Sequence, residues 1–307
     1  MGIIHTKKAS VAADEVRTTR YHLNAPCSIA LLTDFHNRSW EPVIEALEPL
    51  HPDMICIAGD VFYGGVDSCM ENQKNVLPFL ESCGSTAPTF LSLGNHDWAL
   101  TPPDLAAIRQ LGITILDNAW TNADLGEIKK HRVAGNVGDQ QGRNVAAAID
   151  DRQARSIGDP QARGDASGVD DVQDCGGVPT ILVGGLTSGI TLDLRENDWN
   201  SGTTSRPPQL EWLEDFAARD GYHILLCHHP EYYPRYLKPY DSIDLVLSGH
   251  AHGGQWRFFD RGIFAPGQGF FPKLTSGVHQ RLVISRGLSN TTRFPRLNNP
   301  CEIVYID

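Results

Sequence analysis

The sequence predicts a mixed α/β fold, and three observations support this prediction. Short apolar runs recur along the chain, and segments with helical spacing separate several of them, as in βαβ units. With 41% hydrophobic and 21% charged residues, the composition is that of a globular protein. The length of 307 residues is near the upper limit for one hydrophobic core. We therefore expect a single domain over residues 1–307.

The amino-terminal part alternates strands and helices. The run at 42–50 is predicted to be a helix because Val43, Ile44 and Leu47 fall on one face at helical spacing. The helix at 102–112 begins with prolines and has Gly112 where a C-terminal cap is favoured. Strands are predicted at 28–34, 54–60, 89–95 and 113–116, and helices at 42–50, 75–83 and 102–112.

The segment from 121 to 178 differs from the rest of the chain. It is rich in Gly, Asp, Ala, Gln and Arg and has few large apolar residues, so it cannot build a core of its own. We expect a flexible insertion within the domain, either a variable surface excursion or a lid over the active site. Regular structure resumes after it. Strands are predicted at 180–186, 222–230, 242–250, 254–259, 281–285 and 302–306, and a helix at 209–219.

Charge and cysteine content exclude several classes of function. The formal net charge of −11 disfavours unspecific attraction to a nucleic-acid backbone or to an anionic membrane surface. A phosphate substrate remains compatible with this charge, because bound cations dominate the field of a metal site. The seven cysteines form no CxxC pair, which argues against a disulfide framework and against a thiolate zinc site.

The amino terminus bears on the location of the protein. The segment 1–16 has no apolar run after its basic residues, so it does not resemble a secretory signal, and we expect a cytoplasmic protein. No stretch of the sequence is long and apolar enough to span a membrane. Peripheral contact with a membrane stays open.

Five predicted strands end in residue types that bind metals, at the carboxyl ends where α/β sheets place their ligands. In the first, Asp34 and His36 lie two positions apart, and on an extended chain both side chains would face the same side. In the second, Asp60 closes a run that is apolar enough to be buried on both faces. A buried carboxylate needs a partner or a cation, although a helix-capping role would also explain Asp60.

The third strand ends in a polar cluster, Gly94-Asn95-His96-Asp97. Turn chemistry alone explains Gly94 and Asn95 but not the His-Asp pair that follows. Asn95 offers a neutral oxygen ligand, His96 can transfer a proton, and Asp97 can orient His96. The cluster therefore indicates chemistry and not only a turn.

The last two strands end in histidines. His228 begins a His-His-Pro sequence, where a satisfied structural histidine is the alternative to a metal ligand. His250 and His252 lie two positions apart between glycines, so both imidazoles could face one centre. This His-x-His pair is the strongest single motif.

Together the blocks DxH, GD, GNHD, HxP and GHxH, each after an apolar strand, resemble the signature of the calcineurin-like metallophosphoesterases. The tail, with GHAHGGQWRFF and FFPKLTSG, is similar to the bacterial branch that includes envelope-associated phosphoesterases. The resemblance covers roughly 25–118 and 180–307 but not the insertion. Ala251 stands where threonine is common in the family, at a position outside the ligands.

The resemblance implies a four-layer αββα sandwich of two mixed sheets and a site for two divalent metal ions. Manganese is expected, and iron, zinc and nickel also suit the mixed nitrogen and oxygen donors better than magnesium or calcium. Asp60 would bridge both ions. The resemblance assigns Asp34, His36 and His252 to the first ion, and Asn95, His228 and His250 to the second.

The expected reaction is hydrolysis of a small-molecule phosphate ester, with a phosphodiester favoured, by in-line attack of a hydroxide that bridges the metals. By resemblance His96 would act at the leaving-group oxygen, as an acid or a charge stabiliser, with Asp97 holding its tautomer. Arg38, Arg286 and Arg296 could bind a second phosphate, or could be solvated surface residues.

Two other functions are weighed against hydrolysis of an ester. One is a pyrophosphatase that acts on a nucleotide-linked lipid precursor with the same ligands. The other is a metal-binding scaffold without activity, which the retention of every ligand and of His96 disfavours. A metallopeptidase is disfavoured because the sequence has no HExxH helix.

Overall fold

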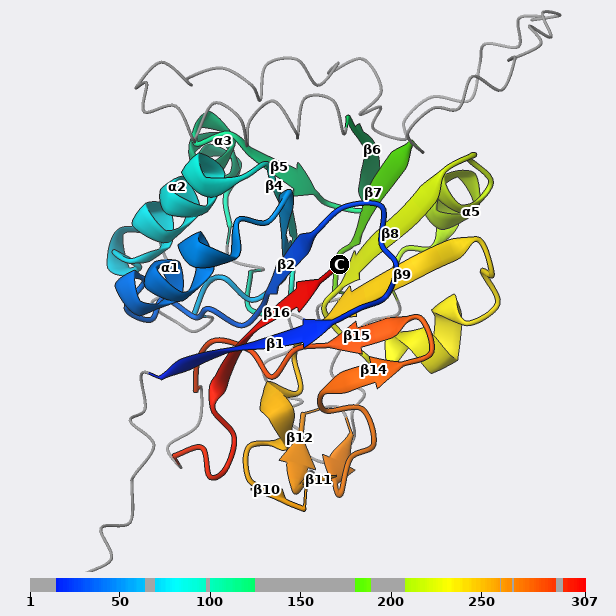
Figure 1. Cartoon of the computed structure of the whole chain (residues 1–307). Coiled ribbons are helices and arrows are strands. Elements are labelled where there is room, and N and C mark those ends of the chain that lie inside the picture. The colour runs from blue at the N-terminus through cyan, green and yellow to red at the C-terminus, as the bar shows by residue number, and fades with distance from the viewer. Residues whose placement is uncertain are drawn as a thin grey trace, which may run out of the picture.

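The computed structural model describes residues 15–63, 70–97, 100–124, 180–188, 208–259, 261–266, 268–290 and 295–307. Within them, two six-stranded sheets make up the centre of the molecule (Figure 1). The segment predicted as an insertion lies largely outside these residues. Its first three positions belong to strand β6 (Ala119–Ala123), which pairs antiparallel with β7 (Ile181–Leu186).

The first sheet contains the predicted amino-terminal strands. It is mixed, because β2, β3, β4 and β5 run parallel to one another while β16 runs antiparallel to β2. Its strand order is β1-β16-β2-β3-β4-β5. The bounds are β1 (Val16–Tyr21), β2 (Ile29–Leu32), β3 (Met54–Ala58), β4 (Thr89–Ser92), β5 (Ile113–Leu116) and β16 (Cys301–Ile306).

Helices connect the parallel strands of this sheet, as the alternation in the sequence predicted. Thr101 caps the third of them: its side chain accepts from the Asp104 N–H, and the Asp104 carboxylate accepts from the Thr101 N–H. Gly112, with φ of 81°, follows its end. The helices are α1 (Glu41–Leu47), continued by η1 (Glu48–Leu50), then α2 (Val76–Thr86), preceded by η2 (Met70–Asn72), and α3 (Pro102–Gln110).

The second sheet is also mixed, with strand order β14-β15-β9-β8-β7-β6. Strands β7, β8, β9 and β15 are parallel, and β6 and β14 run antiparallel at the two edges. Helix α5 (Glu211–Ala217) connects β7 to β8. The remaining elements of this half are β8 (Tyr222–Cys227), η5 (Tyr233–Leu237), β9 (Ile243–Ser248), η6 (His252–Gly254), β14 (Gly277–His279) and β15 (Leu282–Ile284).

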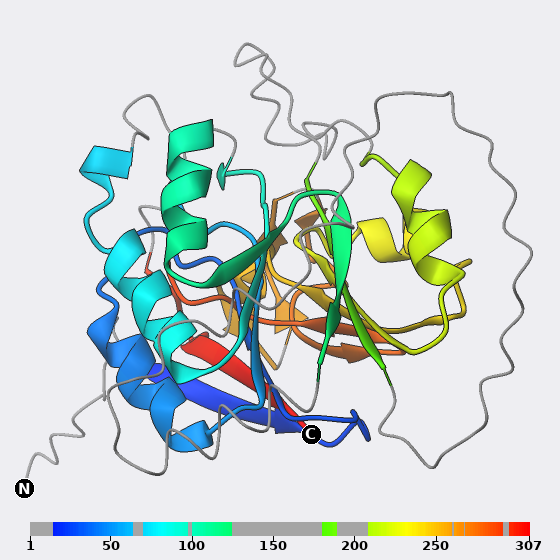
Figure 2. The same cartoon turned by 90° about the horizontal axis from the view of Figure 1, so that it is seen from above.

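Three apolar clusters separate four layers, which confirms the predicted αββα sandwich (Figure 2). Alternation along β2 shows how the layers arise, since Leu32 packs toward helices α1 and α2 while Ile29 and Leu31 pack between the sheets. Phe216 of α5 belongs to the third cluster, on the outer face of the second sheet. Each sheet is therefore buried on both faces.

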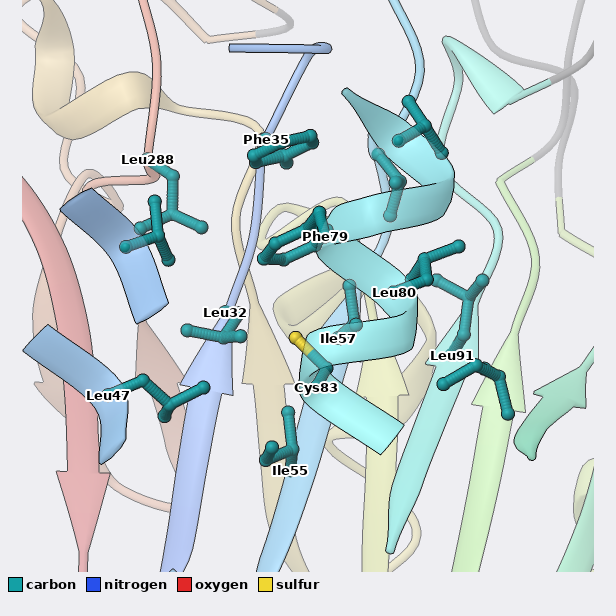
Figure 3. Packing of buried hydrophobic residues seen from close by; sticks show 14 of the residues in the cluster. Leu32, Phe35, Leu47, Ile55, Ile57, Phe79, Leu80, Cys83, Leu91 and Leu288 are labelled. Carbon is teal, nitrogen blue, oxygen red and sulfur yellow. The ribbon is translucent and has the colours of Figure 1, made fainter. Parts of the chain in front are cut away.

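The contact of Phe79 on Phe35 anchors the first motif loop to the helical layer. Their rings stack with centroids 3.9 Å apart, and both side chains are fully buried (Figure 3). Phe35 lies between the two predicted ligands Asp34 and His36. Packing against helix α2 therefore fixes the position of that loop.

Phe79→Ala is expected to destabilise the protein by about 3–5 kcal/mol, because it leaves a cavity beneath the motif loop. Urea unfolding followed by circular dichroism measures this change. Phe259→Ala is the control, since Phe259 is 98% exposed and its loss should change stability by less than about 0.5 kcal/mol. Equal unfolding midpoints for the two variants would contradict the role given to Phe79.

The structure differs from the predicted elements mainly at the edges. Strand β1 was not predicted, because its polar sequence VRTTRY has no apolar run; pairing with β16 holds it at the sheet edge. The strand predicted at 254–259 is shorter than expected. It is β10 (Arg257–Phe258), and it forms a hairpin with β11 (Arg261–Gly262), followed by a second hairpin of β12 (Phe264–Ala265) and β13 (Gly269–Phe270).

Two further predictions from the sequence concern disulfide bonds and membrane-spanning segments. Five of the seven cysteines lie in the described residues; they are buried and none is in a disulfide. Among the helices of those residues, none has the length and apolar character needed to cross a bilayer.

Candidate metal centre

The five motif loops meet at one edge, where strands from both sheets end. The loop after β2 runs beside the loop after β3, because the Asp34 N–H donates to Gly59 O (3.1 Å) and the His36 N–H donates to Asp60 O (3.2 Å). In the second sheet the Gly249 N–H donates to His228 O (3.0 Å) and joins the loops after β8 and β9. The carboxyl ends of the strands thus deliver all five motifs to one place.

Most predicted ligands gather in two groups whose donor atoms lie within 4.8 Å of one another. The first group is Asp34, His36 and His252, and the second contains Asp60, His228 and His250. In the first, His252 Nε2 lies 3.4 Å from Asp34 Oδ1; in the second, His228 Nε2 lies 2.9 Å from Asp60 Oδ2. His36 Nε2, 3.6 Å from Asp60 Oδ2, links the two groups.

Hydrogen bonds to backbone carbonyls orient two of the rings. The Nδ1 of His36 bonds to Phe62 O (2.9 Å), and the Nδ1 of His228 bonds to Ala58 O (2.7 Å). Each ring therefore donates its Nδ1 proton to the backbone and turns its Nε2 toward the carboxylates. Within the described residues, His36 Nε2 and Asn95 Oδ1 are buried without a hydrogen-bond partner. Buried acceptors of this kind fit a bound cation.

The motif loops reach this geometry through left-handed backbone conformations. Asp34 and His36 have φ of 54° and 45°, Asp60 has 56°, and His250 and His252 have 64° and 45°. Such angles are uncommon outside glycine and cost of order 1–3 kcal/mol each. The expectation that Asp34 and His36 converge along an extended chain is therefore wrong, because β2 already ends at Leu32 and tight turns aim both side chains.

Two glycines of the motifs allow backbone to approach the carboxylates. A Cβ on Gly94 would overlap the Asp60 carboxylate, and a Cβ on Gly249 would lie 2.5 Å from Asp34 Oδ2. Only a residue without a side chain fits at either position. These contacts explain why glycine precedes Asn95 and His250 in the sequence.

The sequence suggested that Asp97 orients His96, but in the structure the Asp97 carboxylate binds backbone N–H groups instead. Its Oδ2 accepts from the N–H groups of Gly94 (2.7 Å) and Asp60 (2.8 Å), and its Oδ1 accepts from Phe62 N–H (3.1 Å). Burial, reinforced by the charge of Asp60, raises the pKa of Asp97 to about 6. The three hydrogen bonds to the Asp97 carboxylate fix the backbone that carries Asp60.

His96 is the accessible histidine at this edge. Its side chain is 33% exposed, whereas those of His36, His228 and His252 are at most 9% exposed. The His96 N–H donates to Asp60 Oδ1 (2.8 Å), and its Nε2 lies 4.0 Å from Asp60 Oδ2. Burial lowers the pKa of His96, although Asp60 opposes this shift. Its ring lies at the rim, where a substrate can reach it.

The electrostatics of the site favour a cation. Burial lowers the pKa of His250 to about 3 and of His252 to about 4, so both rings are neutral at pH 7 with a lone pair available. Burial would also lower the pKa of His228, but Asp60 and Asp34 outweigh it and raise this pKa to about 10. A pKa this high means that His228 Nε2 carries a proton toward Asp60. A divalent ion held by Asp60 and His228 would replace this proton.

The three arginines near the motifs support the loops. Arg286 pairs with the buried Glu302 (2.6 Å), and Arg38 donates to Leu288 O. Arg296 donates to Arg286 O (2.8 Å), and its Nη2 lies 3.2 Å from His252 Nδ1. Each guanidinium therefore contacts the protein and not only solvent.

Sequence reasoning assigned no role to His229 and Glu231, which the structure brings beside His250 with donor atoms within 4.8 Å. His229 Nδ1 bonds to Ser188 Oγ (2.7 Å), and burial lowers the pKa of His229 and raises that of Glu231. The sequence feature that could have indicated these two residues is the pair His228-His229, followed two positions later by Glu231.

The family comparison matches the part of the chain that contains these motifs. The family model for calcineurin-like phosphoesterases matches residues 27–254, which contain every predicted ligand. The uncharacterized protein YpbG of Bacillus subtilis is 51% identical over 43 residues, and this stretch is 14% of the chain and 15% of YpbG.

Among solved structures, the NAD nucleotidase NadN of Haemophilus influenzae matches 91% of this chain and 44% of its own length. The identity is 12% and the TM-score is 0.39. The chain thus spans less than half of that protein and a small part of YpbG.

Proposed function

Because the chain belongs to the calcineurin-like phosphoesterase family, we propose that it is a hydrolase that uses two divalent metal ions to cleave a phosphate ester, with a phosphodiester favoured. Its substrate would be a small molecule. We further propose that residues 1–307 form one metallophosphoesterase domain, with 121–178 as an insertion, and that the protein acts in the cytoplasm.

One observation carries the proposal. Two groups of buried donor atoms adjoin each other at the sheet edge, and the Asp60 carboxylate reaches members of both. In addition, the atoms His36 Nε2 and Asn95 Oδ1 are buried without a hydrogen bond in the described structure. Leaving such atoms unpaired is costly, and a ligand set explains why the fold retains them.

Each ion would have its own ligands. The first would be held by Asp34, His36 and His252, the second by Asn95, His228 and His250, and Asp60 would bind both. When bound, the ions would stabilise negative charge on phosphate oxygens and acidify a water molecule for in-line attack. Manganese is proposed because the donors mix imidazole nitrogen with carboxylate and amide oxygen; iron, zinc and nickel are the other candidates.

The chain itself would contribute orientation and a proton. The carbonyls of Phe62 and Ala58 hold the Nδ1 protons of His36 and His228, which keeps both Nε2 atoms on the metal side. His96, at the exposed rim, would donate a proton to the leaving-group oxygen or stabilise its charge. Asp97 would act as a positioning residue, through the backbone of Asp60.

The test is an assay of purified protein, stripped with a chelator and then supplied with manganese. Hydrolysis is measured on bis- and mono-nitrophenyl phosphate, and then on nucleotides and nucleotide-linked lipids. We expect hydrolysis of the bis-ester that requires added manganese. Hydrolysis of pyrophosphate-linked lipids alone would favour the pyrophosphatase alternative, and metal binding without any hydrolysis would favour a scaffold.

A further inference from the structure

Exposed aromatic side chains gather on the two small hairpins that follow the last ligand loop. Eight large hydrophobic side chains are exposed in the described part of the chain, and six of these lie on the hairpins or directly beside them. Phe259 is 98% exposed, Phe271 75% and Phe270 69%. We call this set the aromatic face; its residues are Trp256, Phe258, Phe259, Phe270, Phe271 and Leu297.

Backbone hydrogen bonds join the two hairpins into one unit. The Ile263 N–H donates to Trp256 O (2.9 Å), and the Phe271 N–H donates to Ile263 O (2.8 Å). Leu297 lies beside Trp256 in a β-bridge. Figure 1 shows β10, β11 and β12 together at the lower end of the molecule, away from helices α1 to α3. The residues of the aromatic face therefore belong to one hydrogen-bonded unit of the fold.

The same unit is attached to the metal centre. Gly254 ends η6, the turn that begins at His252, and its carbonyl accepts from Ile263 N–H (3.0 Å). The Arg257 guanidinium donates to Gly253 O (2.8 Å). The hairpins are therefore held directly to the loop that carries a predicted ligand.

Contacts within the fold account for part of this face, since Phe270 packs edge-on against Phe264 and Trp256 Nε1 donates to Pro295 O (2.9 Å), but not for Phe259 and Phe271. Phe259 and Phe271 have φ of 48° and 54°, left-handed values that bulky residues rarely adopt. Strain of this kind persists where something compensates for it, yet both side chains point to solvent rather than into the core. Patches of exposed aromatic residues commonly mark interaction surfaces.

Local charge indicates the partner. The chain is acidic as a whole, but residues 254–300 contain seven Lys or Arg and a single Asp. Several of these cations are buried or paired within the fold, whereas Arg261 in β11 and Lys273, just after β13, are exposed. Aromatic rings flanked by exposed cations suit the interface of an anionic bilayer, where the rings enter the headgroup region and the cations meet phosphate groups. The net charge of −11 for the whole chain therefore does not describe this segment, where basic residues outnumber acidic ones.

We propose that the aromatic face docks on the surface of an anionic lipid bilayer, with Phe259 and Phe271 entering the headgroup region and Arg261 and Lys273 contacting lipid phosphates. Docking in this way brings the edge with the metal centre next to the membrane. The docking itself does not require the proposed hydrolysis, so either proposal can fail alone.

The test is co-sedimentation of the full chain with vesicles of phosphatidylcholine mixed with phosphatidylglycerol, and with vesicles of phosphatidylcholine alone. We expect binding to the mixed vesicles that weakens as salt is added. The double variant Phe259→Ser with Phe271→Ser should bind at least about tenfold more weakly, because it loses two insertable rings. Arg261→Gln with Lys273→Gln should lose the preference for the anionic lipid.

Two variants serve as controls. Val278→Ser removes an exposed apolar side chain outside the aromatic face, and Arg219→Gln removes a distant exposed cation; both should bind like the wild type. Hydrolysis of soluble bis-nitrophenyl phosphate should be equal in wild type and double variant. Absence of vesicle binding, or equal binding by the double variant, would overturn the proposal. So would a dimer in sedimentation velocity that the double variant loses, since the face would then join two copies of the chain.

Discussion

Asp60→Asn is expected to lower metal content and turnover together, more than any other single change in the site. The Asp60 Oδ2 lies 2.9 Å from His228 Nε2 and 3.6 Å from His36 Nε2, so this carboxylate reaches both groups of predicted ligands. Asparagine keeps the shape but removes the charge and one anionic donor. The loss in metal affinity should exceed the roughly 10–100-fold typical of changes to residues behind the ligands.

Metal content, measured by atomic emission after dialysis, and kcat/KM on the bis-ester give two independent readouts. Asp215→Asn is the matched control, because it makes the same change on the solvent side of helix α5, where Asp215 pairs with Arg219. The control should keep both metal and activity. A variant at Asp60 with full metal content and full turnover would refute the assignment of the metal centre.

Stability provides a third readout of the same substitution. A ligand that binds only the folded state raises the free energy of unfolding, by about 2.7 kcal/mol at one hundred times its Kd. Manganese should therefore raise the unfolding temperature of the wild type and of Asp215→Asn, but not that of Asp60→Asn. This measurement separates loss of the ion from loss of the fold, because it compares each protein with itself.

The central strands could be predicted because they are buried on both faces. The runs of β2 and β3 consist of consecutive apolar residues, and this signal does not depend on distant parts of the chain. Strand β1 gave no such signal, since its partner β16 lies nearly three hundred residues away and its own residues are polar. Edge strands are determined by long-range pairing rather than by local sequence.

The identity of the candidate ligands could be predicted from strand ends, but their orientation could not. The carbonyl that accepts from His228 Nδ1 belongs to Ala58, 170 residues earlier in the chain. Left-handed angles at Asp34 and His36 likewise depend on how the loops after β2 and β3 meet. Contacts of this kind arise from the packing of two sheets, which no local pattern specifies.

The role of Asp97 illustrates the same limit. Its place beside His96 in the sequence suggested a contact between the two side chains. In the structure its oxygens accept from N–H groups of Gly94, Asp60 and Phe62, because the chain turns at Gly94 and points the carboxylate back under the neighbouring loop. Adjacent residues in a turn commonly face different directions.

His96→Ala is expected to lower turnover by roughly 10²–10⁴-fold while metal content stays close to that of the wild type. His96 is the one histidine of this edge with a third of its side chain exposed, and the ligand assignment does not include it. A ligand atom of His96 also lies within 4.8 Å of ligand atoms of His36 and Asp60, so the metal measurement decides between a ligand and a proton donor. Unchanged turnover would remove His96 from the mechanism.

The leaving group distinguishes the two roles that His96 can have. Nitrophenolate departs without a proton, whereas the anion of an unactivated phenol or alcohol needs one. If His96 donates that proton, His96→Ala should slow hydrolysis of a diphenyl ester more than hydrolysis of the bis-nitrophenyl ester. If His96 only stabilises charge on the phosphate, both esters should be slowed equally. The ratio of the two losses therefore measures proton transfer by His96, independently of how much activity the variant retains.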